Sequence, residues 1–172
     1  MGTPSELHLV RHAIAAERGE DWPDDDKRPL TTRGVARFEE SVEGMRRLGV
    51  EVDEIFTSPL IRAKQTAELM ASGLPGKPTV RTLDALAPGH TPVSVMAQLN
   101  RAAKRRRIAL VGHEPDLGEL AAHLIGAGRA LPFKKGGACR IDLESLTSRR
   151  AGALSWFVQP KLLRGLKKKG KG

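Results

Sequence analysis

The chain has 172 residues, of which 40% are hydrophobic and 3% aromatic, and it contains no tyrosine. This length fits one domain with an aliphatic core, and no apolar run approaches the roughly 20 residues of a membrane-spanning helix. The net charge is +9, but six of the cations lie between residues 161 and 171, a stretch without acids. The rest of the chain is only mildly basic, so charge alone does not identify a nucleic-acid-binding protein.

The cysteine content and the N-terminal sequence suggest a compartment. Cys139 is the only cysteine, so no internal disulfide can form, and we expect it to serve as a small buried hydrophobic residue. An apolar segment begins close to the first residue and leaves no room for a secretory signal peptide. We therefore expect a cytoplasmic protein. We also expect a monomer, because no exposed apolar stripe stands out.

The first half of the chain alternates between strand and helix patterns. Residues 6–10 are typical of a short strand, and the polar stretch 13–28 is typical of a loop. A threonine cap, followed by apolar residues three or four positions apart, predicts a helix over residues 35–48 that ends at a glycine. Residues 54–58 predict a second strand, and the proline after it opens a helix over residues 59–70.

The second half continues this alternation. It predicts strands over residues 79–83, 107–111, 138–143 and 153–158, and helices over residues 92–103 and 115–125. Alternating strands and helices indicate an α/β class with a mostly parallel sheet. The end of the chain is basic and rich in glycine, so we assign residues 1–160 to a single domain and residues 161–172 to a flexible tail.

Polar residues follow three of the predicted strands. Arg11 and His12 follow the first, Arg62 lies in the segment after the second, and His113 follows the strand over residues 107–111. Because ligands of open α/β sheets bind beyond the carboxyl ends of the strands, we expect these four side chains to meet at one edge. The sequence therefore predicts a site that combines two arginines with two histidines.

This combination suits a phosphoryl group. Arginine presents a planar fork of donors that matches phosphate oxygens, and a nearby helix N-terminus adds backbone donors. A histidine with a free ring nitrogen can attack phosphorus and form a covalent intermediate. The remaining cations then stabilise the charge on the transferring group. We expect no metal and no other cofactor, because the cations supply this stabilisation and the histidines lack metal-ligand spacing.

Three sequence blocks resemble the signature of a known family. LVRHA (residues 9–13), SPLIRAKQTA (residues 58–67) and VGHEP (residues 111–115) are similar to the blocks of the histidine phosphatase superfamily, which includes the phosphoglycerate mutases. The short length and the block RPLTTRG (residues 28–34) resemble its SixA-type phosphohistidine phosphatase branch. The resemblance spans about residues 6–125 and implies a three-layer α/β/α fold of the phosphoglycerate mutase type.

The resemblance also implies roles for individual residues. His12 becomes the nucleophile, and Arg11, Arg62 and His113 clasp the phosphoryl group. Arg28 is a further phosphate contact. The chain departs from the family pattern at Ala13, where a glycine is more familiar.

A second departure concerns the general acid. Many relatives carry a carboxylic acid after the third strand, and here Asp84 is the only acid in residues 83–89, with Glu114 and Asp116 as alternatives. An alkoxide leaving group needs a proton from such an acid. The imidazole of a phosphohistidine can instead leave as a neutral ring. We therefore hypothesise that the enzyme prefers phosphoramidates over simple phosphate esters.

Two further side chains are candidate substrate contacts. His90 lies in a loop of proline and glycine near the expected mouth of the site, and Glu114 adjoins His113. By contrast, the three consecutive aspartates at residues 24–26 lack the spacing of calcium ligands and are interpreted as a solvated loop.

The favoured function is that of a phosphatase acting on phosphohistidine in a protein. Within the enzyme class, the alternative is a phosphatase for small phosphate esters or polyphosphate. Outside it, the alternative is a non-catalytic phosphate- or nucleic-acid-binding module that uses the basic tail and the cations of residues 101–107. Because the chain contains only six aromatic residues to stack on bases, a nucleic-acid partner is disfavoured.

Overall fold

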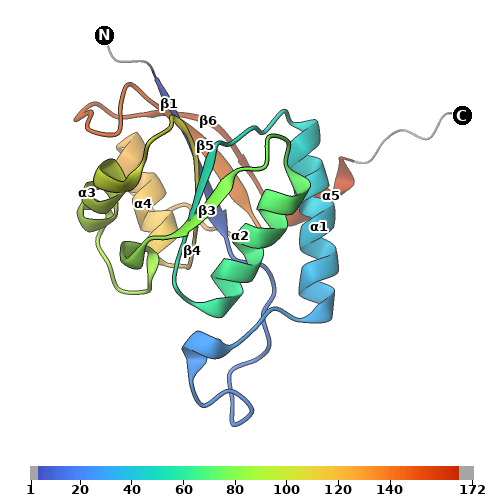
Figure 1. Ribbon diagram of the computed structural model, residues 1–172. Coiled ribbons are helices and arrows are strands. Elements are labelled where there is room, and N and C mark those ends of the chain that lie inside the picture. Colours follow the sequence, from blue (N-terminus) through green and yellow to red (C-terminus); the bar gives the residue numbers. More distant parts are fainter. Residues whose placement is uncertain (1–3, 167–172) are drawn as a thin grey trace, which may run out of the picture.

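The computed structural model describes residues 4–166, which form a six-stranded sheet with helices on both faces (Figure 1). The strands lie in the order β3-β2-β4-β1-β5-β6. Their bounds are β1 Ser5–Arg11, β2 Glu54–Thr57, β3 Thr79–Thr82, β4 Arg107–Gly112, β5 Ala138–Leu143 and β6 Ala153–Val158. The helices are α1 Thr32–Arg47, α2 Ile61–Gly73, α3 Pro92–Ala102, α4 Asp116–Ile125 and α5 Pro160–Gly165, with two 3-10 turns, η1 Asp25–Lys27 and η2 Asp84–Leu86.

The central strands are parallel and buried. β3, β2, β4 and β1 run in one direction, whereas β5 and β6 are antiparallel to their neighbours. Ile108 to Val111 of β4 are fully buried, as expected for a strand covered by helices on both faces. The predicted α/β class with a mostly parallel sheet is confirmed.

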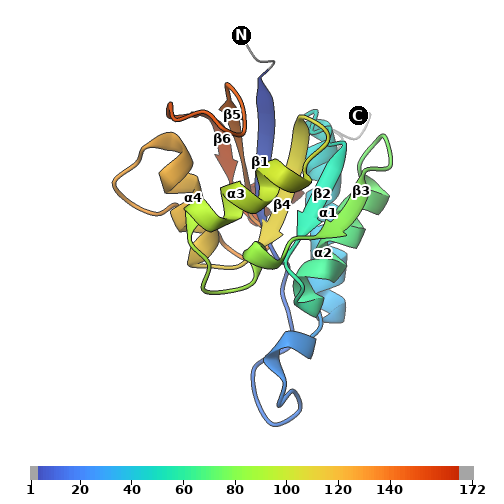
Figure 2. The ribbon, with the colours of Figure 1, turned by 60° about the vertical axis from the view of Figure 1, so that its left-hand side comes forward.

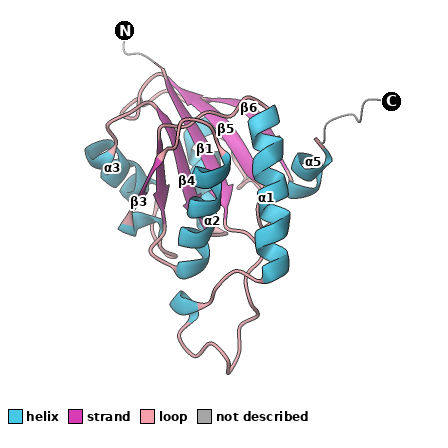
Figure 3. Cartoon of the chain, turned by 45° about the vertical axis from the view of Figure 1, so that its right-hand side comes forward, coloured by secondary structure: helices cyan, strands magenta, loops and turns pink. Residues whose placement is uncertain are grey.

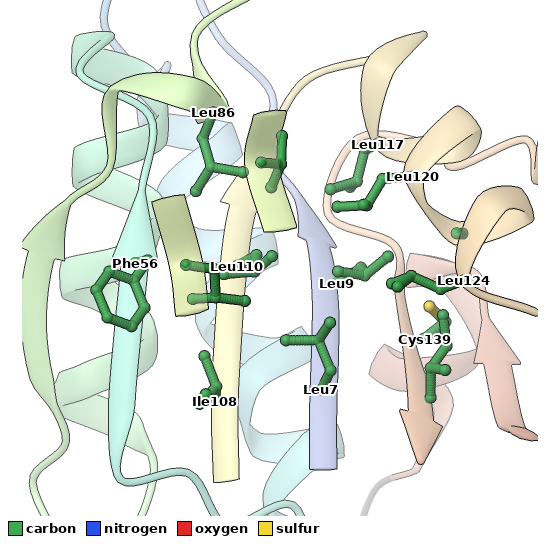
Figure 4. Close-up of a cluster of buried hydrophobic side chains, with 14 of the residues drawn as sticks. Leu7, Leu9, Phe56, Leu86, Ile108, Leu110, Leu117, Leu120, Leu124 and Cys139 are labelled. Atoms are coloured by element: carbon green, nitrogen blue, oxygen red, sulfur yellow. The ribbon is translucent and has the colours of Figure 1, made fainter. Parts of the chain in front are cut away.

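Two apolar layers hold the helices against the sheet. On one face, Leu9 and Leu110 pack with residues of α3 and α4, including Leu117 and Leu120 (Figure 4). On the other face, the side chains that point away from this layer, such as Val10, pack with residues of α1, α2 and α5. Figures 2 and 3 show the resulting three layers from two further directions. Because the sheet is held from both sides, the carboxyl ends of its central strands form a firm base for a site.

The helix boundaries follow local side-chain chemistry. Thr31 caps α1, since its hydroxyl accepts a hydrogen bond from Gly34 N at 2.9 Å. α2 begins at Ile61, two residues later than the sequence predicts, because Leu60 has an extended backbone and its N–H donates to the Ser58 hydroxyl at 3.2 Å. None of the helices in residues 4–166 combines the length and the apolar character needed to span a membrane.

α5 occupies residues that the sequence analysis assigns to a flexible tail. Leu163 is fully buried in the layer beneath α1, so the folded domain extends beyond residue 160. Gly44 of α1 permits this contact, because a Cβ atom there would lie 2.1 Å from the carbonyl oxygen of Leu163. Leu163 thus anchors a segment whose composition is otherwise strongly cationic. The expectation for residues 167–172 falls outside the described residues.

Candidate active site

Three neighbouring strands bring their following residues to one edge of the sheet. β4 lies between β2 and β1, and all three are parallel. The pairing continues past the strand ends, because His12 N donates to Gly112 O at 3.1 Å and Ser58 N donates to Val111 O at 3.0 Å. His12, Ser58 and His113 therefore lie side by side, although they come from distant parts of the chain.

The ring of His12 has one nitrogen engaged by the backbone. Its Nδ1 lies 2.7 Å from the carbonyl oxygen of Ala13. A carbonyl can only accept a hydrogen bond, so Nδ1 carries the ring proton and Nε2 keeps its lone pair. Burial, together with the positive charges of Arg62 and Arg11, lowers the pKa of His12 to about 3, although the bond to Ala13 opposes this shift. His12 is therefore neutral, as a nucleophile must be.

The second histidine faces the first. The ring centroids of His12 and His113 are 5.1 Å apart, with the rings tilted by 53°. The Nε2 atom of His113 lies 2.7 Å from the hydroxyl oxygen of Ser58. Burial and the positive charge of Arg62 lower the pKa of His113 to about 4. Both histidines are therefore uncharged at neutral pH.

Two arginines of the site meet at Asp25. Arg62, in the first turn of α2, donates to the Asp25 carbonyl at 2.8 Å and lies 3.0 Å from its carboxylate. The Nε of Arg28 donates to the same carboxylate at 2.9 Å, and its Nη1 donates to Ala16 O at 2.7 Å. Burial alone would raise the pKa of Asp25, but the hydrogen bond from Arg28 and the charge of Arg62 lower it overall. Asp25 therefore stays ionised and keeps the two guanidinium groups together.

Arg11 approaches the site from the end of β1. Its Nη1 donates to the carbonyl of Phe133 at 2.7 Å, which fixes the direction of the guanidinium. Its Nε is buried and has no hydrogen-bond partner among the residues described. Arg11 therefore retains a donor for a ligand.

These side chains line one cleft of about 390 Å³. Its walls include Arg11, His12, Arg28, Arg62, His113 and Glu114, together with Glu17, Arg18, Pro88 and Lys135. A larger hollow of about 570 Å³ lies between α3, α4 and residues 145–151, but it shares no residue with this cleft. Because only the 390 Å³ cleft combines facing histidines with several arginines, we identify it as the candidate active site.

The candidate acids and substrate contacts divide between this cleft and the surface. Glu114 lines the cleft, accepts a hydrogen bond from Gly118 N at 2.8 Å, and has its pKa raised by burial. Asp84 and His90 are both exposed and do not line the cleft. Asp116 accepts a hydrogen bond from Gly89 N at 2.6 Å, which ties the loop of His90 to α4. The cleft thus excludes Asp84 and His90, because η2 and the following loop place them outside it.

Two polar residues that organise the site were not among those predicted from the sequence. Asp25 lies within the three aspartates that were interpreted as a solvated loop, yet it bridges Arg28 and Arg62. Asp25 lies three residues before Arg28, a spacing from which their ion pair could have been predicted. Ser58 directly follows β2, just as His12 and His113 directly follow β1 and β4, so its place at a strand end could also have identified it. Within residues 4–166, no three His, Cys, Asp or Glu side chains are grouped to hold a metal ion.

Comparisons with known proteins identify related sequences. The family model of the histidine phosphatase superfamily (branch 1) matches residues 7–87. An uncharacterized protein of Picosynechococcus sp. is 41% identical over 136 residues, which cover 77% of this chain and 81% of that protein. Phosphohistidine phosphatase SixA of Escherichia coli K12 is 25% identical over 157 residues, covering 90% and 94%.

Solved structures extend the similarity to the fold. A structure of the protein histidine phosphatase SixA complexed with tungstate has a TM-score of 0.78 and 26% identity, covering 92% of this chain and 99% of that one. A putative SixA from Agrobacterium tumefaciens has a TM-score of 0.73 at 19% identity, covering 91% and 98%. The matched family, the shared fold and the facing histidines of the cleft lead to one conclusion: the chain belongs to the histidine phosphatase superfamily.

Proposed function

We propose that this protein is a metal-independent phosphatase that passes a phosphoryl group from its substrate to Nε2 of His12 and then to water, with phosphohistidine in a protein as its preferred substrate. The observation that carries the proposal is the state of His12. It is neutral, its Nδ1 is bound to Ala13 O, and it lies in a cleft with Arg11, Arg62 and His113.

The chemistry consists of two transfers at phosphorus. In the first, the lone pair on Nε2 of His12 forms a P–N bond while the bond to the leaving group breaks. In the second, water attacks phospho-His12 and releases inorganic phosphate. Arg11, Arg62, Arg28 and His113 would stabilise the charge on the oxygens of the transferring group in both steps.

The acids near the cleft favour a leaving group that needs little protonation. Asp84, the acid that follows the third strand, is exposed outside the cleft. Glu114 lines the cleft but is bound to the backbone of α4 through Gly118. An alkoxide would need a well-placed proton donor, whereas a phosphohistidine ring protonated on its other nitrogen leaves as neutral imidazole. This difference supports phosphohistidine over alkyl phosphates.

Similarity to SixA supports the same substrate class. The relative from Escherichia coli is a phosphohistidine phosphatase, and the similar solved structure contains tungstate, a tetrahedral oxyanion. An oxyanion of this shape would fit the arginine cluster of the cleft. We therefore expect tungstate to inhibit this protein competitively.

The test measures phosphate release from a phosphohistidine protein, para-nitrophenyl phosphate and an alkyl phosphate, with chelator present. We expect the phosphohistidine protein to be the best substrate and the alkyl phosphate the poorest, with turnover in each case abolished by His12→Ala. His123→Ala, an exposed histidine outside the cleft, is the matched control and should retain activity. Equal rates on phosphohistidine and alkyl phosphate would refute the substrate preference. Tungstate binding without any turnover would indicate a phosphate-binding module instead of an enzyme.

A further inference from the structure

Ser58 connects the start of α2 to the second histidine of the cleft. Its side chain is fully buried, and its backbone is fixed by the hydrogen bond to Val111 O. The hydroxyl oxygen lies 3.2 Å from Leu60 N and 2.7 Å from Nε2 of His113. Ser58 is thus the link between a rigid backbone turn and the ring of His113.

The hydrogen atoms of this link can be assigned by elimination. The N–H of Leu60 can only donate, so the Ser58 oxygen accepts there. If Nε2 of His113 also donated, both the hydroxyl hydrogen of Ser58 and Nδ1 of His113 would lack a partner, whereas the other tautomer leaves only Nδ1 without one. The favourable arrangement has the Ser58 hydroxyl donating to Nε2. The single ring proton of neutral His113 then resides on Nδ1.

We infer that Ser58 is a positioning residue that holds His113 in the Nδ1–H tautomer, so that His113 donates a neutral hydrogen bond to an oxygen of the transferring phosphoryl group. The inferred tautomer is independent of the proposed function, which bears only on the effect of Ser58 on turnover.

The unpartnered atom of His113 indicates where a ligand would be bound. Nδ1 of His113 is buried and has no hydrogen-bond partner among the described residues, although His113 lines the cleft beside His12. A buried N–H group without an acceptor is unfavourable, and a bound phosphoryl oxygen would supply one. The charges of Arg62 and Arg11 also disfavour a second proton on the ring. His113 therefore contributes a directed donor, while the arginines contribute the positive charge.

The first test is a tautomer measurement that needs no substrate. Ring ¹⁵N shifts of His113, assigned with His113→Asn, should show a protonated Nδ1 and an unprotonated Nε2 in the wild type at neutral pH. In Ser58→Ala the ring should lose this preference and shift toward the Nε2–H form. Adding tungstate should move the Nδ1–H resonance of the wild type, because an oxyanion then accepts from it.

The second test is kinetic. Ser58→Ala should lower kcat by about tenfold, the scale expected when one buried hydrogen bond is lost. Ser41→Ala is the matched control, since Ser41 is also buried but its hydroxyl donates only to Arg37 O on α1. Ser41→Ala should leave both kcat and the His113 tautomer unchanged.

The outcomes separate this inference from the proposed function. A protonated Nε2 on His113 in the wild type overturns the inference, whether or not the protein is a phosphatase. The Nδ1–H tautomer in a protein without turnover supports the role of Ser58 and refutes the enzyme. An active protein whose kcat is unaffected by Ser58→Ala overturns the positioning role. A wild-type Nδ1–H resonance that tungstate does not move overturns the donation to a phosphoryl oxygen.

Discussion

The two walls of the candidate active-site cleft are held in place by different interactions. One wall, with His12 and His113 at the surface and Ser58 buried behind them, is fixed by backbone hydrogen bonds between parallel strands. The other wall comes from the loop between β1 and α1, which extends away from the sheet in Figures 1 and 2 and holds Arg28 through Asp25. The Asp25 side chain is 40% exposed, so solvent and salt screen its ion pairs.

Because the two walls are held differently, we expect them to affect kcat and KM differently. Backbone pairing in a buried sheet tolerates little displacement, so under the proposed function the strand wall would determine where His12 meets phosphorus. Ion pairs at a partly exposed carboxylate can rearrange, so under the proposed function the loop wall would determine how tightly the phosphate dianion is held. Substitutions on the strand wall should therefore reduce kcat, whereas substitutions on the loop wall should mainly raise KM.

The largest effect is expected on the strand wall. His113→Ala removes a donor next to His12 and should lower kcat for para-nitrophenyl phosphate by about 100- to 1000-fold, the cost typical of losing one such donor. Circular dichroism should show an intact fold. A change in KM alone would contradict the division between the walls.

A smaller effect is expected on the loop wall. Arg28→Ala should raise KM by about tenfold with a lesser change in kcat, the loss of one charge-assisted hydrogen bond. The effect should shrink at high salt, because the loop wall is partly exposed. Arg33→Ala, an exposed arginine on α1, is the control and should change neither constant. If Arg28→Ala reduces kcat as much as His113→Ala does, the two walls do not act separately.

The base of the loop offers a third comparison. A Cβ at Gly34 would lie 2.0 Å from the carbonyl oxygen of Ile14, where the loop leaves the sheet. Gly34→Ala should therefore reduce the free energy of unfolding by about 1–3 kcal/mol, as measured by urea denaturation. It should raise KM a few-fold by displacing the loop wall. Gly19→Ala, at a site with no atom within 4 Å of the new Cβ, should leave both quantities unchanged.

The smallest effect concerns pH. The pKa values of His12 and His113, at about 3 and 4, lie below the ordinary 6.5, so both rings should stay neutral from pH 7 to pH 5. Their NMR shifts should hardly move over this interval.

The same pKa values predict how the free energy of unfolding changes with pH. Below pH 6.5 the unfolded chain binds protons at these histidines and the folded protein does not, so the free energy of unfolding should fall as pH decreases from 6.5 to about 4. Urea denaturation at pH 7 and pH 5 measures this trend. Histidine shifts with a midpoint near 6.5 would show that the strand wall is open to water.

The strand wall was predictable from the sequence, and the loop wall was less so. An apolar run followed by a polar pair places His12 and His113 at the same edge, because parallel strands share one direction. No periodicity determines the path of an irregular loop. For that reason, Asp25 was taken for a solvated residue, and His90 was expected at the mouth of a site that it does not line. Likewise, the burial of Leu163 depends on a gap at Gly44, which becomes visible only in three dimensions.

The pairing of β1 with β4 also has a consequence for folding. Arg11 and Gly112 are partners on the neighbouring strands β1 and β4, but about one hundred residues separate them in the sequence. Their contact therefore closes a long loop, and contacts of this kind slow folding. A partly folded chain can form helices and local turns without bringing the two histidines together. During synthesis, no phosphate site can exist until residue 113 has left the ribosome. In refolding, activity should return no earlier than the pairing of β1 with β4.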